Sequence, residues 1–345
     1  MTFPQKTVAR TALALLLAGC GGALATAAGV SAGWLCGAAL FVAVAAIRQV
    51  PLAVPPALVM PAYVVLGAGM GSAVRPDLLL DFGHPAVSAT AILLAILATT
   101  AAGYVVLRLC GWGAETAFFS AVPGALVQSV ALAEAVPGVN VPVVAMVQTL
   151  RLIVLVTVVP LIIGSVGAPV PVPVAEVPFD LPLFLLLATC AIGQFLAHRL
   201  RLPAALLIGP FFASLLLHGS GLNAAHVPQP LLIPAYVVIG AHIGTRFGRT
   251  SPDVLLRLIL PALASTGSGI VVALGVAWGA AAVLSVPPML AFLAFAPGGI
   301  DAMSILALAL HLDAGFVVLL QVARFLLLTV LLPFCAPRMQ GGAEE

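Results

Sequence analysis

Long apolar runs dominate this sequence and require largely apolar surroundings for the folded chain. Runs of 17 to 25 apolar residues follow one another, which is the length an α-helix needs to cross a hydrocarbon core about 30 Å thick. Of the 345 residues, 63% are hydrophobic and only 7% are charged, with a mean hydropathy of +1.24, whereas soluble domains are about a quarter charged. The runs lack the short alternating pattern of barrel strands. The sequence therefore predicts an all-α polytopic membrane protein.

Proline, glycine and the few charged residues divide the chain into twelve apolar segments. These segments lie near 9–29, 32–49, 53–73, 86–109, 115–137, 140–164, 181–200, 203–220, 229–246, 254–283, 287–311 and 314–336. Segments seven to twelve repeat segments one to six, since PAYVVLGAGMG at 61–71 returns as PAYVVIGAHIG at 234–244. We predict a first membrane repeat over 1–164, a Pro-rich linker over 165–180, a second membrane repeat over 181–338 and a C-terminal tail over 339–345. Internal repeats are typical of transporter folds.

The basic residues indicate whether the two copies face the same way. Cytoplasmic loops carry an excess of lysine and arginine. If all twelve segments cross, eleven basic residues near segment ends divide five against six between the two sides. If the fifth segment of each copy is a hairpin that enters and leaves by one face, ten of the eleven lie inside and only Arg75 lies outside. We therefore predict two inverted five-span repeats, each with a re-entrant hairpin, and cytoplasmic termini.

Each predicted hairpin breaks at a proline and glycine in the middle of an apolar segment, at Pro123-Gly124 and at Pro297-Gly298-Gly299. Proline removes a backbone donor and glycine frees the backbone. Broken backbone at membrane depth is tolerated only against protein or water. A helix restarts after each break, and its N-terminal amides favour an anion. We expect the two tips to meet near the midplane, where transporter folds of this kind bind substrate.

Two arginines sit near the middle of apolar segments at matching positions. Arg151 and Arg324 each follow a glutamine by three residues, Gln148 and Gln321. A charge inside the bilayer is costly unless it is paired or hydrated. We interpret the arginines as an anion-binding or gating pair with the glutamines in support. The alternative is a structural ion pair with Glu134 or Asp301.

Other polar side chains gather just past the two breaks. Gln128 and Ser129 follow the first break, while Asp301 and Ser304 follow the second. We predict that they complete a substrate site with the arginines and the Pro-Gly tips, although Asp301 is also compatible with a solvated loop. Glu134, Asp301 and Asp313 are the candidates for a coupling ion, proton or sodium. Asp313 is equally suited to cap a helix.

The motif that occurs at 61–71 and again at 234–244 indicates helix packing rather than a catalytic or binding role. Gly67-x-x-x-Gly71 and Gly240-x-x-x-Gly244 place small residues on one helix face, which permits close approach of another helix. His242 stands where the first copy has Gly69. We interpret it as a histidine with satisfied hydrogen bonds near the inner face, with a ligand-binding role as the alternative.

These motifs resemble a known family. PGG-x-D-A-M-S-x-L-A at 297–307, PGALVQSVALA at 123–133 and the two V-Q-x-x-R helix starts are similar to those of bacterial membrane proteins with a duplicated AbrB unit. Such proteins carry labels that name a transcriptional regulator of the AbrB family or an ammonia monooxygenase. The resemblance spans essentially the whole chain and implies a multi-pass protein of the bacterial inner membrane, acting in transport or regulation. Many members carry a glutamate where this chain has Ala302, so we transfer the acidic role to Asp301.

Both labels conflict with the chemistry of the sequence. No stretch outside the apolar segments is long enough for a soluble basic DNA-binding domain. The six histidines show no HxxxH or HxxE spacing, and no Walker loop is present. We therefore expect no enzyme activity, no metal, no cofactor and no nucleic-acid partner.

The predicted function is secondary transport of a small anionic or zwitterionic solute across the inner membrane by alternating access. The expected partners are the solute, a coupling ion and the lipid bilayer. The sequence is also compatible with a homo-oligomer. One alternative is a membrane-embedded regulator that contacts a partner through loops such as TRFGRTSPDVLLR at 245–257. A passive channel is the second alternative.

Overall fold

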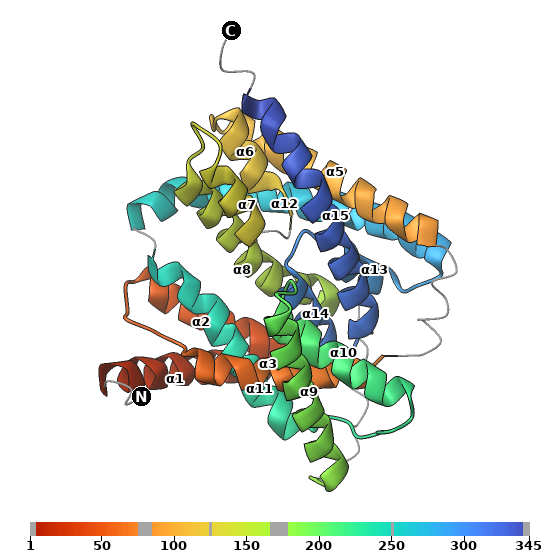
Figure 1. The fold of residues 1–345 in the computed structure, drawn as a ribbon. Coiled ribbons are helices and arrows are strands. Elements are labelled where there is room, and N and C mark those ends of the chain that lie inside the picture. Colours follow the sequence, from red (N-terminus) through yellow and green to blue (C-terminus); the bar gives the residue numbers. More distant parts are fainter. Residues whose placement is uncertain (1–4, 75–84, 124–125, 166–178, 250–251, 341–345) are drawn as a thin grey trace. The chain divides into compact units, whose positions relative to one another are not determined.

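The computed structural model describes residues 5–74, 85–123, 126–165, 179–249 and 252–340, and within these ranges it contains helices and no strands (Figure 1). The first half of the chain contains α1 (Gln5–Ala27), α2 (Gly33–Ile47), α3 (Pro56–Ser72), α5 (Pro85–Leu109), α6 (Ala114–Ala121), α7 (Leu126–Glu134) and α8 (Val141–Ser165). The second half contains α9 (Leu181–Arg199), α10 (Ala205–Gly219), α11 (Gln229–Thr245), η1 (Arg246–Arg249), α12 (Pro252–Leu284), α13 (Pro288–Phe295), α14 (Ile300–Ala309) and α15 (Ala314–Gln340). Most of the predicted linker and the last five residues of the tail lie outside the described ranges.

The same order of helices occurs in both halves. In each half, three helices precede a long helix, two short helices separated by a non-helical break, and a final long helix. This order agrees with the predicted duplication. The opposite orientation of the copies and the re-entry of the short helix pairs stay predictions.

Among the residues that the structure describes, seven helices are long and apolar enough to cross a membrane. The qualifying stretches are Thr7–Ala27, Ala86–Leu109, Val141–Ile162, Leu181–Arg199, Gln229–Gly248, Arg257–Leu284 and Ala314–Leu332. Three further predicted spans, α2, α3 and α10, have only 15, 17 and 15 residues, or roughly 22 to 26 Å at 1.5 Å per residue. Ala32 and Ala204 adopt the left-handed conformation just before α2 and α10, which sets where these two helices begin. The structure supports a multi-pass membrane protein, and the full set of ten spans stays a prediction.

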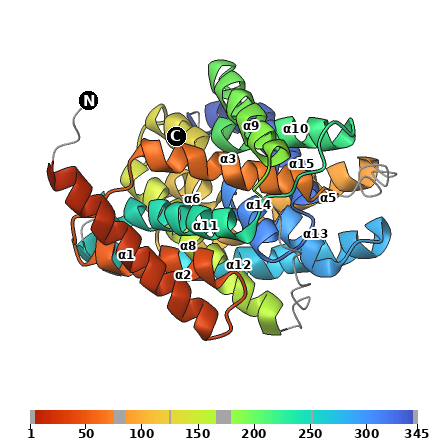
Figure 2. The same cartoon turned by 90° about the horizontal axis from the view of Figure 1, so that it is seen from below.

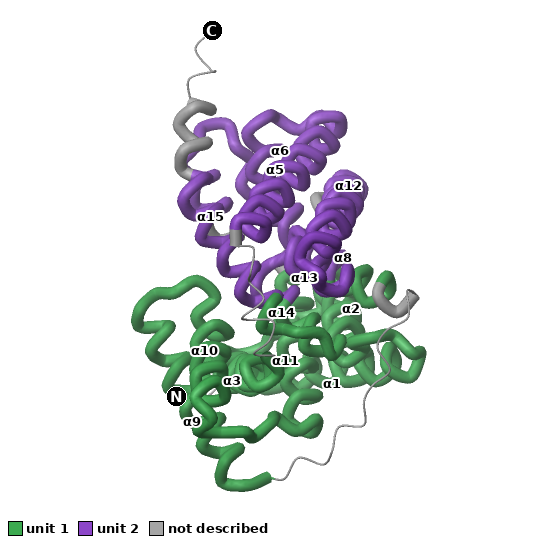
Figure 3. Tube along the Cα trace, turned by 90° about the vertical axis from the view of Figure 1, so that its right-hand side faces the viewer, with its two compact units in different colours: residues 1–80, 156–249, 304–316 green, residues 81–155, 250–303, 317–345 purple. Residues whose placement is uncertain are grey.

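The helices divide into two compact units, and each unit takes equivalent helices from both halves of the chain (Figure 3). Unit 1 comprises residues 1–80, 156–249 and 304–316, and so includes α1, α2 and α3 with their equivalents α9, α10 and α11. Unit 2 comprises residues 81–155, 250–303 and 317–345, and includes α5, α6 and α7, α12 and α13, the first part of α8 and most of α15. The compact units therefore cut across the sequence repeats.

Close helix packing in unit 1 explains why the line PAYVV-x-GA-x-x-G occurs twice. The helix α3 packs against α10, while its equivalent α11 packs against α2 (Figure 2). A Cβ atom on Gly67 would lie 2.6 Å from the Cβ of Pro210, and one on Gly240 would lie 2.7 Å from the carbonyl oxygen of Leu35. Only glycine permits these approaches, so the predicted packing role of the repeated glycines is confirmed.

A proline inside α10 shows how polar side chains support the same packing. Pro210 has no N–H, so the carbonyl of Leu206 loses its partner within the helix. The buried Gln194 of α9 donates from Nε2 to this oxygen at 2.9 Å and to the carbonyl of Met60 in α3 at 3.0 Å. One amide therefore satisfies the broken backbone of α10 and joins α9 to α3.

We predict that Gly240→Ala lowers the thermal unfolding temperature of the purified protein in detergent, because the new methyl group overlaps α2. Overpacking of this kind costs about 1–3 kcal/mol. Gly19→Ala in α1 is the matched control, since no atom lies within 4 Å of a Cβ placed there, and alanine is about 1 kcal/mol better than glycine in a helix. An unfolding temperature that responds equally to both substitutions would contradict the packing assignment.

Candidate functional site

Unit 2 contains a helix break whose unpaired backbone carbonyls accept hydrogen bonds from an arginine and a glutamine. The helix α6 ends at Ala121, and Pro123 follows without an N–H to offer. From α8, Arg151 donates to the carbonyl of Ala121 at 3.1 Å and to that of Val122 at 2.9 Å. Three residues earlier on the same helix, Gln148 donates to the carbonyl of Phe119 at 2.8 Å. The side chains of α8 thus satisfy backbone oxygens that the break leaves unpaired.

The second break is held in the same way by the equivalent residues of α15. Gln321 donates to the carbonyls of Leu293 and Ala294 in α13, at 2.9 and 3.2 Å. Arg324 donates to the carbonyls of Ala296 and Gly298, and to the side-chain oxygen of Gln321. We call each glutamine with its arginine a Gln–Arg clamp: Gln148 with Arg151, and Gln321 with Arg324.

Equivalent caps fix the start of the two helices that carry the clamps. The side chain of Asn140 accepts a hydrogen bond from the backbone N–H of Val143 at 3.3 Å, just before α8. The side chain of Asp313 accepts one from the N–H of Phe316 at 2.9 Å, just before α15. Asp313 is therefore a helix cap, as one of its two interpretations predicted. Its role with a coupling ion stays a prediction.

Both clamps are buried and carry positive charge. The exposed fractions are 4% for Gln148, 7% for Arg151, 0% for Gln321 and 3% for Arg324. The two guanidinium groups are close enough for their charges to interact. All the hydrogen-bond acceptors of both arginines among the described residues are uncharged oxygens. The alternative of a structural ion pair with Glu134 or Asp301 stays a prediction.

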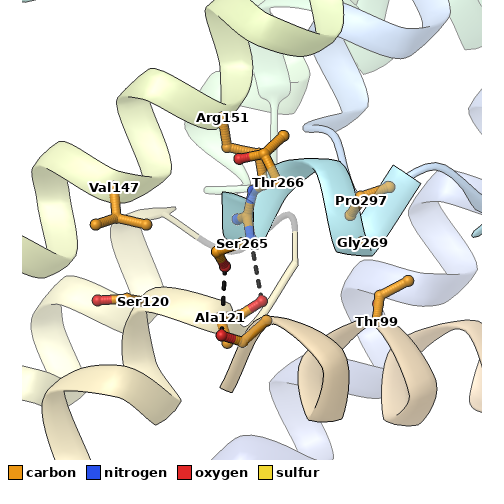
Figure 4. Close-up of a pocket in the computed structure, with 10 residues that line it drawn as sticks. Thr99, Ser120, Ala121, Val147, Arg151, Ser265, Thr266, Gly269 and Pro297 are labelled. Carbon is orange, nitrogen blue, oxygen red and sulfur yellow. Dashed lines mark hydrogen bonds between the residues drawn. The ribbon is translucent and has the colours of Figure 1, made fainter. Parts of the chain in front are cut away.

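A small polar cavity lies beside Arg151 (Figure 4). It offers about 10 Å³ to the centre of a water molecule, which is room for roughly one water or one atom of similar size. The described residues that line it are Thr99, Gly103, Ser120, Ala121, Val147, Arg151, Ser265, Thr266, Gly269 and Pro297. Figure 4 shows Arg151 reaching from α8 toward Ala121, with Ser265, Thr266 and Pro297 around it. The end of α6 and the proline of the second break therefore line one cavity.

Two hydroxyl groups of this cavity lack partners. Ser120 and Thr266 are 1% and 2% exposed, and neither hydroxyl has a hydrogen-bond partner among the described residues. The hydroxyl of Ser265 donates to the carbonyl of Gly103 at 3.4 Å, a long hydrogen bond. A buried hydroxyl without a partner costs about 1–3 kcal/mol.

The other residues that the sequence predicts at the first break lie in different environments. Pro123 is buried at the break, whereas Gly124 and the side chain of Gln128 lie outside the described residues. Ser129 is fully buried in α7, and its hydroxyl has no partner in the described part of the chain. Glu134 is exposed at the last residue of α7.

In the second break, Gly298 contributes a carbonyl to the clamp and has no room for a side chain. A Cβ on Gly298 would lie 2.5 Å from Cγ of Met303, while one on Gly299 would meet nothing within 4 Å. Asp301 is half-buried in the first turn of α14. Ser304 is fully buried in the same helix, and its hydroxyl lacks a partner among the described residues.

Sequence reasoning missed the hydroxyl groups of Ser120, Thr266 and Thr99. Ser265 and Thr266 lie in the middle of the 33-residue helix α12, where adjacent polar residues in an apolar segment were the available signal. No group of three or more histidine, cysteine or acidic side chains suited to a metal ion occurs within the residues that the structure describes.

Fold and site define a polytopic helical membrane protein in which two broken helices are held by a pair of buried arginines. The family model described as "Transition state regulatory protein AbrB" matches residues 34–340, and the chain belongs to this family. The resemblance found from the sequence motifs is thereby confirmed.

Two relatives extend this comparison. The protein named "Putative regulator AbrB" from Escherichia coli (strain K12) is 26% identical over 287 residues, covering 80% of this chain and 81% of the relative. The "Uncharacterized protein YhjN" from Bacillus subtilis (strain 168) is 28% identical over 269 residues, covering 70% of this chain and 68% of the relative. No solved structure matches the chain.

We predict that Gln321→Leu lowers the thermal unfolding temperature in detergent. The leucine has a similar volume but cannot donate to Leu293 and Ala294 or accept from Arg324. Each buried polar group left unpaired costs about 1–3 kcal/mol.

Gln229→Leu is the control, because Gln229 is exposed at the start of α11. The clamp has no structural importance if the two leucine variants unfold at the same temperature as the unmodified protein.

Proposed function

We propose that the protein is a secondary transporter that moves a small anionic or zwitterionic solute across the inner membrane by alternating access. The proposal rests on one observation above all, the buried pair Arg151 and Arg324 beside two helix breaks, which donate hydrogen bonds to uncharged backbone oxygens. Removing an ion from water without compensation costs several kcal/mol. An anion from solution would supply that compensation.

The donors available to an anion follow from the clamp geometry. A guanidinium group has five N–H donors, and Arg151 directs two hydrogen bonds to the carbonyls of Ala121 and Val122, at 3.1 and 2.9 Å. The unpaired hydroxyls of Ser120 and Thr266 line the same cavity as Arg151. We propose that Arg151 and the hydroxyl groups that line this cavity contact the charged group of the solute, with the remainder of the solute extending between the hairpin tips. Ser129 and Asp301, which belong to the same unit as Arg151, are proposed to contact that remainder.

The architecture supports alternating access through its two compact units. Each unit takes equivalent helices from both halves of the chain, and inverted repeats generate alternate openings when one bundle moves against another. In this proposal the pairs α6–α7 and α13–α14 are re-entrant hairpins, the copies are inverted and both termini are cytoplasmic. Glu134, Asp301 and Asp313 stay the candidates for a coupling proton or sodium ion. The protein has no enzymatic role in this account.

A transport assay with matched variants tests the proposal. Purified protein in liposomes is offered radiolabelled acetate, lactate, succinate, glycine and glutamate under an imposed proton or sodium gradient. We expect saturable accumulation of at least one of these probes, and we expect the double variant Ser120→Ala, Thr266→Val to raise its half-saturating concentration at least about tenfold, since a hydrogen bond to a charged group contributes about 1.5–3 kcal/mol. The double variant should fold at least as stably, because it removes two unpaired hydroxyls.

Thr99→Val is the control for the same cavity. Its hydroxyl already donates to the carbonyl of Ala95 at 2.5 Å within α5, so transport should be unchanged. Uptake that never exceeds that of protein-free liposomes would contradict the transporter proposal. Equilibration of a probe without accumulation would favour the passive channel.

A regulatory function is the second candidate, because the Escherichia coli relative is named "Putative regulator AbrB". In this alternative the loop 245–257 contacts a partner protein, with Arg246 and Arg257 as described basic residues. Neutralising the basic residues of this loop should abolish signalling and spare transport. Loss of transport together with intact signalling would instead assign the loop to the carrier.

A further inference from the structure

Unit 1 contains a cavity of about 520 Å³ at the C-terminal end of α11. This volume lies within the range of about 300–1,000 Å³ that is usual for ligand pockets. The described residues that line it are Gln49, Val50, Pro51, Leu52, Ala53, Val54, His242, Thr245, Arg246 and Gly248. The pocket therefore lies between the α2–α3 connection and the end of α11.

One wall of this pocket is apolar and continuous. Residues 50–54 form the extended connection between α2 and α3, and all five side chains are aliphatic or proline. Leu52 and Val54 also pack against a buried cluster that includes Val42 and Ala241. The backbone of this wall is thus anchored, and its free surface suits a hydrocarbon chain.

The opposite wall carries the polar groups. His242 and Arg246 are four residues apart, so they project from the same side of α11 and its continuation into η1. The guanidinium of Arg246 is partly exposed and has no hydrogen-bond or ion-pair partner among the described residues. No described lining residue carries a carboxylate, and the exposed Arg48 adds positive charge next to Gln49.

The pocket lies at the end of a candidate membrane-spanning helix. The candidate span Gln229–Gly248 has 20 residues, which is about 30 Å of helix and equals the thickness of the hydrocarbon core. Arg246 lies in the last turn of this candidate span, and His242 lies one turn earlier. A helix of this length that crosses the hydrocarbon core ends near the lipid headgroups, so we infer that Arg246 reaches their level. A guanidinium group forms short charge-assisted hydrogen bonds with phosphate oxygens.

We propose that this pocket binds an anionic phospholipid, with its phosphate on Arg246 and His242 and one acyl chain along residues 50–54. A soluble phosphate would satisfy the arginine but leave the apolar wall in water, whereas an uncharged lipid would leave the guanidinium unpaired. The lipid meets both requirements. This site is independent of the transport proposal and differs from the interpretation of His242 as a histidine with satisfied hydrogen bonds.

The experiment measures thermal unfolding of the purified full-length protein in an uncharged detergent, titrated with phosphatidylglycerol. Phosphatidylcholine and soluble glycerol 1-phosphate at the same concentrations are the comparison ligands. We expect phosphatidylglycerol alone to raise the unfolding temperature by several degrees, because a ligand that binds only the folded state stabilises it. Arg246→Gln should raise the concentration for half-maximal shift at least about tenfold.

Two more variants keep the test decisive. Arg257→Gln is the control, since Arg257 is exposed on α12 and does not line the pocket, and it should retain the full shift. Ala53→Trp keeps the charge but fills the apolar wall, and it should lose the shift even if Arg246→Gln fails to fold. An equal shift with phosphatidylcholine, a shift with glycerol phosphate alone, or an unchanged shift in Ala53→Trp overturns the proposal.

Discussion

The rest of the structure depends on how the carbonyl groups at two helix breaks are satisfied. A helix that stops inside a membrane protein leaves oxygens without donors, and no water is available in hydrocarbon to replace them. The Gln–Arg clamps solve this problem twice, with the same residue types at the same spacing, from helices that are equivalent in the two copies. Arginine suits this role because its planar group can reach two carbonyls at once. The broken helices can therefore be buried without unfolding.

The clamps lower the stability of the fold because they bury positive charge. Each brings a guanidinium charge into the interior, and the charges of Arg151 and Arg324 act on each other. A purely structural solution could have used neutral donors, as Gln194 does beside Pro210 in unit 1. Where positive charge and unpaired hydroxyls share a cavity, the arrangement is unfavourable until an anion enters. If the protein transports a solute as proposed, binding of that solute would relieve this unfavourable arrangement and so favour the bound conformation.

The sequence predicts the class of fold and the duplicated order of helices well, because long apolar runs and repeated motifs are local signals. It also identifies Gln148, Arg151, Gln321 and Arg324 as special. It does not predict that these side chains hold the carbonyls of a segment about thirty residues earlier, because that contact depends on how separate helices pack. Ser120 and Thr266 were missed for a related reason, since a hydroxyl group in an apolar helix usually donates to a carbonyl of its own helix. The division into two compact units was also not predicted, because a repeat shows that copies exist and not which helices pair.

The central claim is that the positive charge of unit 2 is compensated by a small anion from solution. The most direct measurement is the unfolding temperature of the purified protein at constant ionic strength, with formate or acetate replacing the much larger gluconate as the anion. The account predicts a rise of several degrees with the small carboxylates in the unmodified protein, and a much smaller rise in the double variant Ser120→Ala, Thr266→Val. An unfolding temperature that is the same in all three salts, or that rises equally in the variant, would contradict it.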